Sequence, residues 1–192
     1  QAHAQVIDRA IIPGTQGGPF MHTIAAKAVG FKLALEEPFK NDQIQTIINA
    51  QAMASTLQDL GYRIVSGGTD NHLFIVDLRS HRLTGLEAEE ALAKAGISIS
   101  RSCIPFDPEK PWITSGIRIG TPAITTRGMK EIQATTIAHY IDEIIKSRND
   151  THKLTAIQKK INDLCSQFPI YAKNSEALTS KNRVNAMCQQ QV

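Results

Sequence analysis

Two short apolar segments separated by a glycine-rich turn constrain the fold of this chain more than any other feature of its sequence. Residues 62–66 and 72–78 are rich in residue types that favour strands, and the sequence GGTDN (Gly67–Asn71) lies between them. A connection this short joins antiparallel neighbours, because parallel strands need a much longer crossover. The chain is therefore expected to contain an antiparallel sheet that includes this hairpin.

Apolar periodicity predicts the elements around the hairpin. Pro19 is expected at the first position of a helix that Pro38 ends, and Asn41 is expected to cap a second helix that stops at Gly61. Thr84 and Glu87 form the pattern of a capping box. The remaining predictions are loops over residues 1–18 and 101–114, strands over 97–100 and 116–120, and helices over 84–95, 127–146 and 151–168.

This order of elements indicates an α+β domain in which helices cover one side of a small, mostly antiparallel sheet. The helix before Pro38 looks like part of another domain. The chain is accordingly divided into residues 1–37, a small domain over 38–170 and a polar tail over 171–192.

Composition narrows the classes of function. The net charge is +3 and no dense Lys/Arg block is present, so nucleic acid is not expected as a partner. The three cysteines are widely spaced, which predicts reduced thiols in a cytosol-like compartment and no metal site. Neither a signal peptide nor an apolar run of about 20 residues is visible, so no membrane segment is expected.

Two places in the sequence suit an anion. Arg118 alternates with Ile117 and Ile119, so on a strand it faces away from both, either toward solvent or as a bidentate clamp for a carboxylate. Gly17 and Gly18 precede a predicted helix, where exposed N–H groups favour phosphate, although a tight turn that needs a positive φ is the more common reason for two such glycines.

Other polar residues give weaker signals. Asp70 and His72 could form a dyad on one strand face, but a structural role for a histidine at a strand start is more common. Arg127 is expected at the surface near a helix start. No nucleophile elbow, phosphate-binding loop or dinucleotide fingerprint is present. The residues alone therefore indicate an anion-binding α+β domain without a catalytic set.

Several segments taken together resemble one family. In order along the chain these are IPGTQGGPFMHTIAAKAVGFKLAL, VSGGTDNHLFIVDL, LTGLEAEEALAKAGI, IPFDPEKPW and TSGIRIGTPAITTRG. Their combination resembles the C-terminal half of serine hydroxymethyltransferase, a pyridoxal-phosphate enzyme of the aminotransferase-like fold type I. The resemblance implies that residues 1–37 are the tail of the large cofactor-binding domain and that residues 38–170 are the small domain.

The resemblance also implies roles for individual residues. Arg118 would bind the substrate carboxylate, and Gly17 and Gly18 would reach the cofactor phosphate of the neighbouring subunit. The segment Lys110, Pro111 and Trp112, together with Ser102, would contact folate. Ser102 stands where the family often has asparagine, and Lys110 and Trp112 replace its more usual serine and phenylalanine.

The implied reaction is the interconversion of serine and glycine, with tetrahydrofolate as one-carbon acceptor, in a cytoplasmic homodimer or higher oligomer. The family's Schiff-base lysine lies in a Thr-Thr-His-Lys stretch that this sequence does not contain, so no catalytic residue is assigned here and the chain alone is expected to be inactive. The alternatives are a non-catalytic module that pairs with a full-length or N-terminal-half subunit, and a simple carboxylate- or phosphate-binding domain.

Overall fold

A computed structural model describes residues 2–170 and divides the chain into two compact units, one up to Asn41 and one from Asp42 onward. The predicted tail over residues 171–192 lies outside the described residues.

The first unit is more helical than the sequence predicts. Helix α1 covers Ala4–Arg9 and α2 covers Met21–Ala34. Between them, a π-helical segment covers Ala10–Thr15 and is interrupted at Ile12, whose backbone is extended. The prediction of a loop over residues 1–18 was therefore wrong for residues 4–15. The reason is that residues 4–11 contain neither glycine nor proline and include several good helix formers. Pro19 also lies outside α2, because the extended backbone of Phe20 separates the two.

Pro38 does not end a helix, as the sequence predicted, but lies at the beginning of one. Helix α3 covers Glu37–Asp59, so Pro38 lies in its first turn and Asn41 lies inside the helix instead of capping it. Proline is tolerated in a first turn because the N–H that it lacks has no partner within the helix there. Gly61 follows the helix with a φ of 92°, which agrees with its predicted role as a stop.

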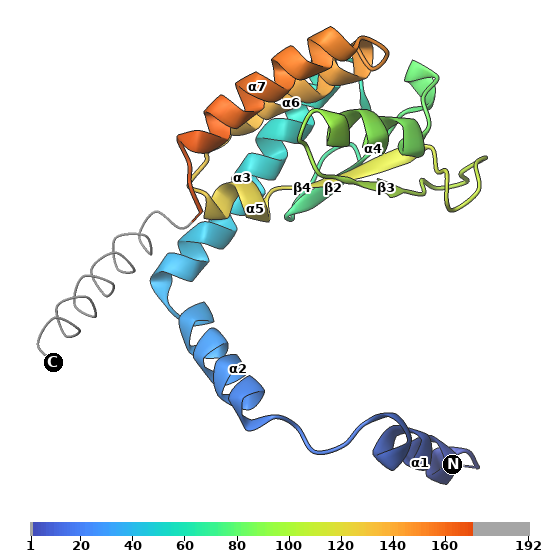
Figure 1. Ribbon diagram of the computed structural model, residues 1–192, viewed down its shortest axis with the longest axis vertical. Helices are drawn as coiled ribbons and strands as arrows, with labels where there is room; N and C mark the ends of the chain where they lie inside the picture. Colours follow the sequence, from blue (N-terminus) through green and yellow to red (C-terminus); the bar gives the residue numbers. More distant parts are fainter. Residues whose placement is uncertain (1, 171–192) are drawn as a thin grey trace, which may run out of the picture. The chain divides into compact units, whose positions relative to one another are not determined.

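The second unit contains a four-stranded sheet, shown in Figure 1, with the order β1-β2-β4-β3. The strands are β1 (Arg63–Ile64), β2 (Leu73–Asp77), β3 (Ser100–Ser102) and β4 (Gly116–Gly120). All three neighbouring pairs are antiparallel, which confirms the prediction from the hairpin. Strand β4 has the predicted bounds, whereas β3 begins three residues later than the predicted strand.

Helices and a short turn connect the strands and follow the last of them. A short 3-10 turn covers Arg79–His81, and α4 (Gly85–Lys94) begins with the predicted capping box of Thr84 and Glu87. The helix predicted over residues 127–146 corresponds to α6 (Glu131–Lys146), which begins four residues later than predicted, and a short helix that was not predicted, α5 (Pro122–Thr126), precedes it. Gly128, whose φ is 92°, separates them, because a left-handed residue cannot continue a right-handed helix. Helix α7 covers Thr151–Ser166.

One face of the sheet forms the core. Phe74 pairs with Ile119 and Val76 pairs with Ile117, and all four side chains are buried. They belong to one cluster with apolar residues of α3, α4, α6 and α7. The opposite face carries the exposed Arg118 and the half-buried Ile75, so the helices cover one side of the sheet.

Candidate functional site

Arg118 occupies the middle of strand β4 on the uncovered face of the sheet. It lies between Ile75 of β2 and Ser100 of β3 in the two antiparallel registers. Its neighbours Ile117 and Ile119 are 0% and 3% exposed, whereas Arg118 is exposed. Burial of the two isoleucines opposes a one-residue slip of β4, because such a slip would expose both of them. The predicted alternation about Arg118 is therefore confirmed.

A shallow hollow of about 500 Å³ surrounds this arginine. Its lining combines one cation with hydroxyl groups and apolar side chains, and consists of His72, Leu73, Ser98, Ile99, Ser100, Arg118 and Gly120. Within residues 2–170, the Arg118 side chain forms no hydrogen bond or ion pair. Its guanidinium therefore has its donors available for an anion, and two parallel N–H groups match a carboxylate.

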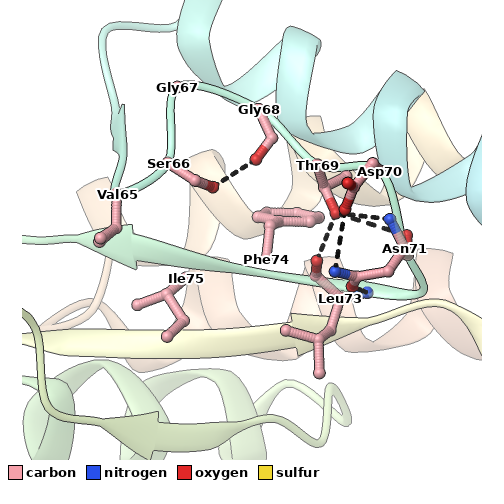
Figure 2. Close-up of a pocket in the computed structure, with 10 residues that line it drawn as sticks. All are labelled: Val65, Ser66, Gly67, Gly68, Thr69, Asp70, Asn71, Leu73, Phe74 and Ile75. Atoms are coloured by element: carbon pink, nitrogen blue, oxygen red, sulfur yellow. Dashed lines mark hydrogen bonds between the residues drawn. The ribbon is translucent and has the colours of Figure 1, made fainter.

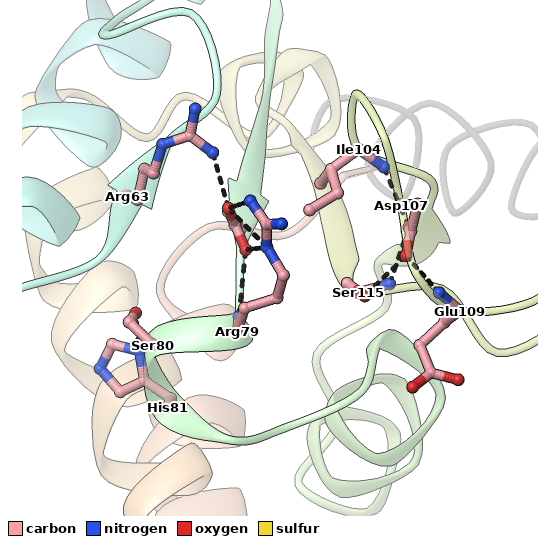
Figure 3. A network of polar contacts seen from close by, with 9 residues as sticks. Arg63, Arg79, Ser80, His81, Ile104, Asp107, Glu109 and Ser115 are labelled. Atoms are coloured by element: carbon pink, nitrogen blue, oxygen red, sulfur yellow. Dashed lines mark hydrogen bonds and ion pairs between the residues drawn. The ribbon is translucent and has the colours of Figure 1, made fainter.

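Two other arginines, Arg63 of β1 and Arg79 of the turn after β2, are already paired, as Figure 3 shows. Asp77, which is 3% exposed, accepts hydrogen bonds from Arg63 Nη1 at 2.6 Å and from Arg79 Nη2 at 2.8 Å. The Arg79 hydrogen bond is the main cause that lowers the pKa of Asp77 to about 2, against the opposing effect of burial. These two arginines therefore stabilise the sheet through Asp77.

The predicted folate-contacting segment lies in the long loop between β3 and β4. Trp112 is 63% exposed, Lys110 Nζ lies 5.5 Å from the centroid of its ring, and Arg101 Nη1 donates to its carbonyl oxygen at 3.0 Å. Ser102 belongs to β3 and pairs with Gly116, two residues before Arg118. Because side chains alternate along strands, Ser102 lies on the same sheet face as Arg118.

Sequence reasoning missed Asp107 in this loop. Its carboxylate accepts from Ser115 Oγ at 2.6 Å, Ser115 N at 3.0 Å, Glu109 N at 2.9 Å and Ile104 N at 3.1 Å (Figure 3). Desolvation alone would raise the pKa of Asp107, but these four bonds outweigh it and lower the pKa to about 2. The signal in the sequence was an aspartate that precedes a proline in an irregular segment, a pattern typical of turns built on side-chain acceptors.

The turn between β1 and β2 surrounds a second hollow of about 530 Å³, drawn in Figure 2. Its polar groups mostly serve the turn itself. Thr69 Oγ1 donates to the Leu73 carbonyl at 2.6 Å, and Asn71 Oδ1 accepts from Leu73 N at 3.0 Å. Asp70 accepts from Asn71 Nδ2 at 3.2 Å, and no Asp70–His72 hydrogen bond occurs within the described chain. The dyad considered from the sequence is therefore not assembled.

Gly17 and Gly18 belong to the first unit and are exposed. Neither has a positive φ, and a Cβ atom built on either would meet no atom within 4 Å among the described residues. The alternative that a tight turn requires these glycines is therefore wrong, because nothing in the backbone of this unit demands them.

Arg127 differs from its expected surface role. It is half-buried, and its Nη1 donates to the carbonyl oxygens of Phe168 at 3.0 Å and Cys165 at 3.4 Å. The guanidinium thereby binds carbonyl groups at the C-terminal end of α7, where a positive charge is favoured.

Residues 2–170 contain neither a metal-binding cluster nor a membrane-spanning helix. Nowhere in this range do three or more His, Cys, Asp or Glu side chains gather as they would around a metal ion. The helices described there are also too short or too polar to span a bilayer.

Comparisons with known proteins match most of the chain. The profile of the serine hydroxymethyltransferase family matches residues 1–141. The chain is 50% identical over 171 residues to the serine hydroxymethyltransferase of Psychrobacter cryohalolentis, which corresponds to 89% of this chain and 41% of that protein. It is 51% identical over 172 residues to the enzyme of that name from Myxococcus xanthus, again 41% of the relative's length. The chain thus spans about two fifths of the curated relatives that it matches.

Proposed function

Because this chain belongs to the serine hydroxymethyltransferase family, we propose that it supplies the substrate-carboxylate site of a transferase that interconverts serine and glycine. The one-carbon unit would pass to tetrahydrofolate. The observation that carries the proposal is Arg118, an exposed arginine without a partner among residues 2–170, on a strand whose register is held by buried neighbours.

The carboxylate of serine or glycine is the anion that we assign to Arg118. Arg63 and Arg79 both pair with Asp77, whereas Arg118 faces a hollow with the hydroxyl of Ser100 and the backbone of Gly120 nearby. A planar guanidinium discriminates in favour of a carboxylate, because both of its parallel N–H groups are satisfied at once. The small volume of serine and glycine is compatible with the modest size of the hollow.

Pyridoxal phosphate is the proposed cofactor of the assembled enzyme, and it supplies the electron sink for bond cleavage next to the amino group. Gly17 and Gly18 are the residues of this chain that we assign to its phosphate. Both residues are exposed, and neither adopts a conformation that requires glycine. We therefore propose that glycine is present here because the phosphate approaches the backbone closely. The sequence has no Thr-Thr-His-Lys stretch, so we propose that the chain by itself forms no lysine-linked cofactor.

Folate is assigned to the loop between β3 and β4. Trp112 offers an exposed aromatic face and Lys110 places a positive charge beside it, while Arg101, which is paired with Glu89, donates to the Trp112 carbonyl. A flat heteroaromatic ring linked to a tail that carries carboxylate groups fits this combination. Ser102 lies on the face of the sheet that also carries Arg118, and it is a further proposed contact.

The first unit is proposed to be the tail of the large cofactor-binding domain. Helix α2 carries apolar residues around its whole circumference, including Phe20 just before it and the exposed Met21, Val29 and Phe31. A helix of this kind is buried in a complete protein. We propose that the intact enzyme is a cytoplasmic homodimer or a higher oligomer in which this surface is covered.

Reconstitution tests the proposal. The chain is mixed with the separately expressed segment of the Myxococcus xanthus relative that precedes the matched region, and tetrahydrofolate-dependent conversion of serine to glycine is measured. Activity is expected in the mixture and not in either part. Arg118→Lys should lower kcat/KM at least about tenfold, because a bidentate charged contact is lost. Arg82→Lys is the matched control, since this exposed arginine forms no side-chain bond within residues 2–170. Equal activity of the two variants would overturn the role of Arg118.

A non-catalytic module that pairs with a subunit of the family is the second candidate. The exposed apolar residues of α2 favour it, since they need a covering partner. Size-exclusion chromatography of the same mixture separates the two proposals: a tight but inactive complex supports the module, and an active complex supports the enzyme.

A further inference from the structure

Four hydrogen bonds from three different positions converge on the carboxylate of Asp107, as Figure 3 shows. Ile104 and Glu109 contribute backbone N–H groups from either side of the aspartate, and Ser115 contributes both its N–H and its hydroxyl. A neutral side chain of the same shape cannot accept all four. This one carboxylate therefore closes the loop onto the residue that directly precedes β4.

The two proposed ligand contacts lie on either side of this closure. Lys110 and Trp112 lie between Glu109 and Ser115 in the chain, and Arg118 follows Ser115 by three residues on β4. The loop packs closely on the strand here, because a Cβ on Gly116 would lie 2.7 Å from Cγ2 of Ile104. The Asp107 bonds therefore help to set where Trp112 lies relative to Arg118, together with the bond from Arg101 to the Trp112 carbonyl and the backbone bonds from Gly85 and Leu86 to the carbonyls of Thr114 and Ile113.

Two residues of the loop have backbones that an L-amino acid adopts only against a steric cost. Phe106 has a φ of 55° and is fully exposed, and Thr114 has a φ of 61°. Phe106 directly precedes Asp107, and Thr114 directly precedes Ser115, which donates two hydrogen bonds to Asp107. The bonds of Asp107 to Ile104 and Glu109 lie on either side of Phe106 and Asp107 and help to hold this part of the loop in place.

We propose that Asp107 is a positioning residue that holds Lys110–Trp112 in a fixed place relative to Arg118, so that folate bound at the loop lies beside the amino acid bound at Arg118. The inference rests on the proposed function for its ligand, but its structural half stands on the hydrogen bonds alone. Asp107 itself contacts no proposed substrate; it acts through the loop and through Ser115.

The single tryptophan of the sequence, Trp112, reports on this loop directly. Asp107→Asn and the milder Ser115→Ala are compared with the wild-type chain by tryptophan fluorescence anisotropy and amide hydrogen exchange. Both are measured at a temperature well below the midpoint of thermal unfolding of each variant. Asp107→Asn is expected to lower the anisotropy and to accelerate exchange at Ile104, Glu109 and Ser115 by roughly tenfold or more. Ser115→Ala should give a smaller change in the same direction. Glu109→Gln is the matched control, because it removes a neighbouring charge but keeps all four bonds.

Ligand binding to the full chain provides the second readout. Titration with tetrahydrofolate is followed by quenching of Trp112, and titration with glycine is followed by NMR of the Arg118 guanidinium. Asp107→Asn should weaken tetrahydrofolate binding by roughly tenfold while glycine binding changes less than about threefold. This difference separates positioning from a general loss of structure, which would weaken both.

The outcomes distinguish the two proposals. Unchanged exchange and anisotropy in Asp107→Asn would overturn the positioning role, whatever the ligands do. If tetrahydrofolate leaves the wild-type fluorescence unchanged while Asp107→Asn still loosens the loop, the folate assignment fails and the positioning of the loop stands. Equal weakening of tetrahydrofolate and glycine binding would also overturn the inference, because the effect would not be specific to the loop.

Discussion

Arg118 of β4 lies directly opposite Ile75 of β2 on the uncovered face of the sheet, while the residues on either side of each lie on the buried face. The same five-residue strand thus serves the core with one set of side chains and presents a cation with the other. A change on one face is therefore expected to affect stability, and a change on the other is expected to affect binding.

Ile117→Ala should destabilise the chain by about 2–5 kcal/mol, because the removed methyl and methylene groups leave a cavity at a fully buried site. Arg118→Ala should change the free energy of unfolding by no more than about 0.5 kcal/mol, since its side chain is exposed. Urea unfolding followed by circular dichroism measures both. A large destabilisation by Arg118→Ala would show that the arginine serves the fold and not a ligand.

Gly85 packs where no side chain fits. A Cβ atom at this position would overlap Thr114 Oγ1 and the Gly116 carbonyl oxygen, which belong to the segment leading into β4. Gly85→Ala is therefore expected to cost about 1–3 kcal/mol, as overpacking does elsewhere. Gly68→Ala is the control, because a Cβ there meets nothing within 4 Å and its φ is not positive. Thermal unfolding that shifts equally in the two variants would contradict the prediction.

Asp77 makes stability depend on pH in the acidic range. Its pKa is lowered to about 2 in the folded chain, mainly by the hydrogen bond from Arg79, whereas an unfolded aspartate titrates near 3.8. The group therefore contributes stability that is present above about pH 4 and is lost as the pH falls toward 2. Urea unfolding across this range should show a shallower dependence on pH in Asp77→Asn than in the wild-type chain, although Asp107 contributes a similar effect that remains.

Arg127 holds the end of the last described helix. Its Nη1 binds the carbonyl oxygens of Phe168 and Cys165. Arg127→Ala should destabilise the chain by about 1–2 kcal/mol, because these carbonyls lose a charged donor near a helix C-terminus. Arg127→Lys should retain part of the effect through its charge. Hydrogen exchange in α7 measures the local consequence, and unchanged exchange there in Arg127→Ala would argue against the contact.

Local patterns sufficed where neighbouring residues decide the outcome. The bounds of β4, the capping box of Thr84 and Glu87 and the stop at Gly61 all depend on residues only a few positions apart. Pro38 was misjudged because its effect depends on whether a helix begins or continues there. Its missing N–H is harmful only inside a helix, and the structure begins α3 one residue earlier.

The sequence by itself determined that this chain forms an antiparallel α+β unit and that Arg118 faces away from the core, because a short turn and a two-residue alternation leave few other folds. Only the tertiary structure decided the strand order, the pairing of Arg63 and Arg79 with Asp77, and the convergence of Ile104, Glu109 and Ser115 on Asp107. In these cases the partners are brought together by the packing of the sheet and its loops. Whether an arginine is paired or remains available for a ligand depends on whether the fold places a carboxylate beside it. The pattern of apolar residues in the sequence does not predict this pairing.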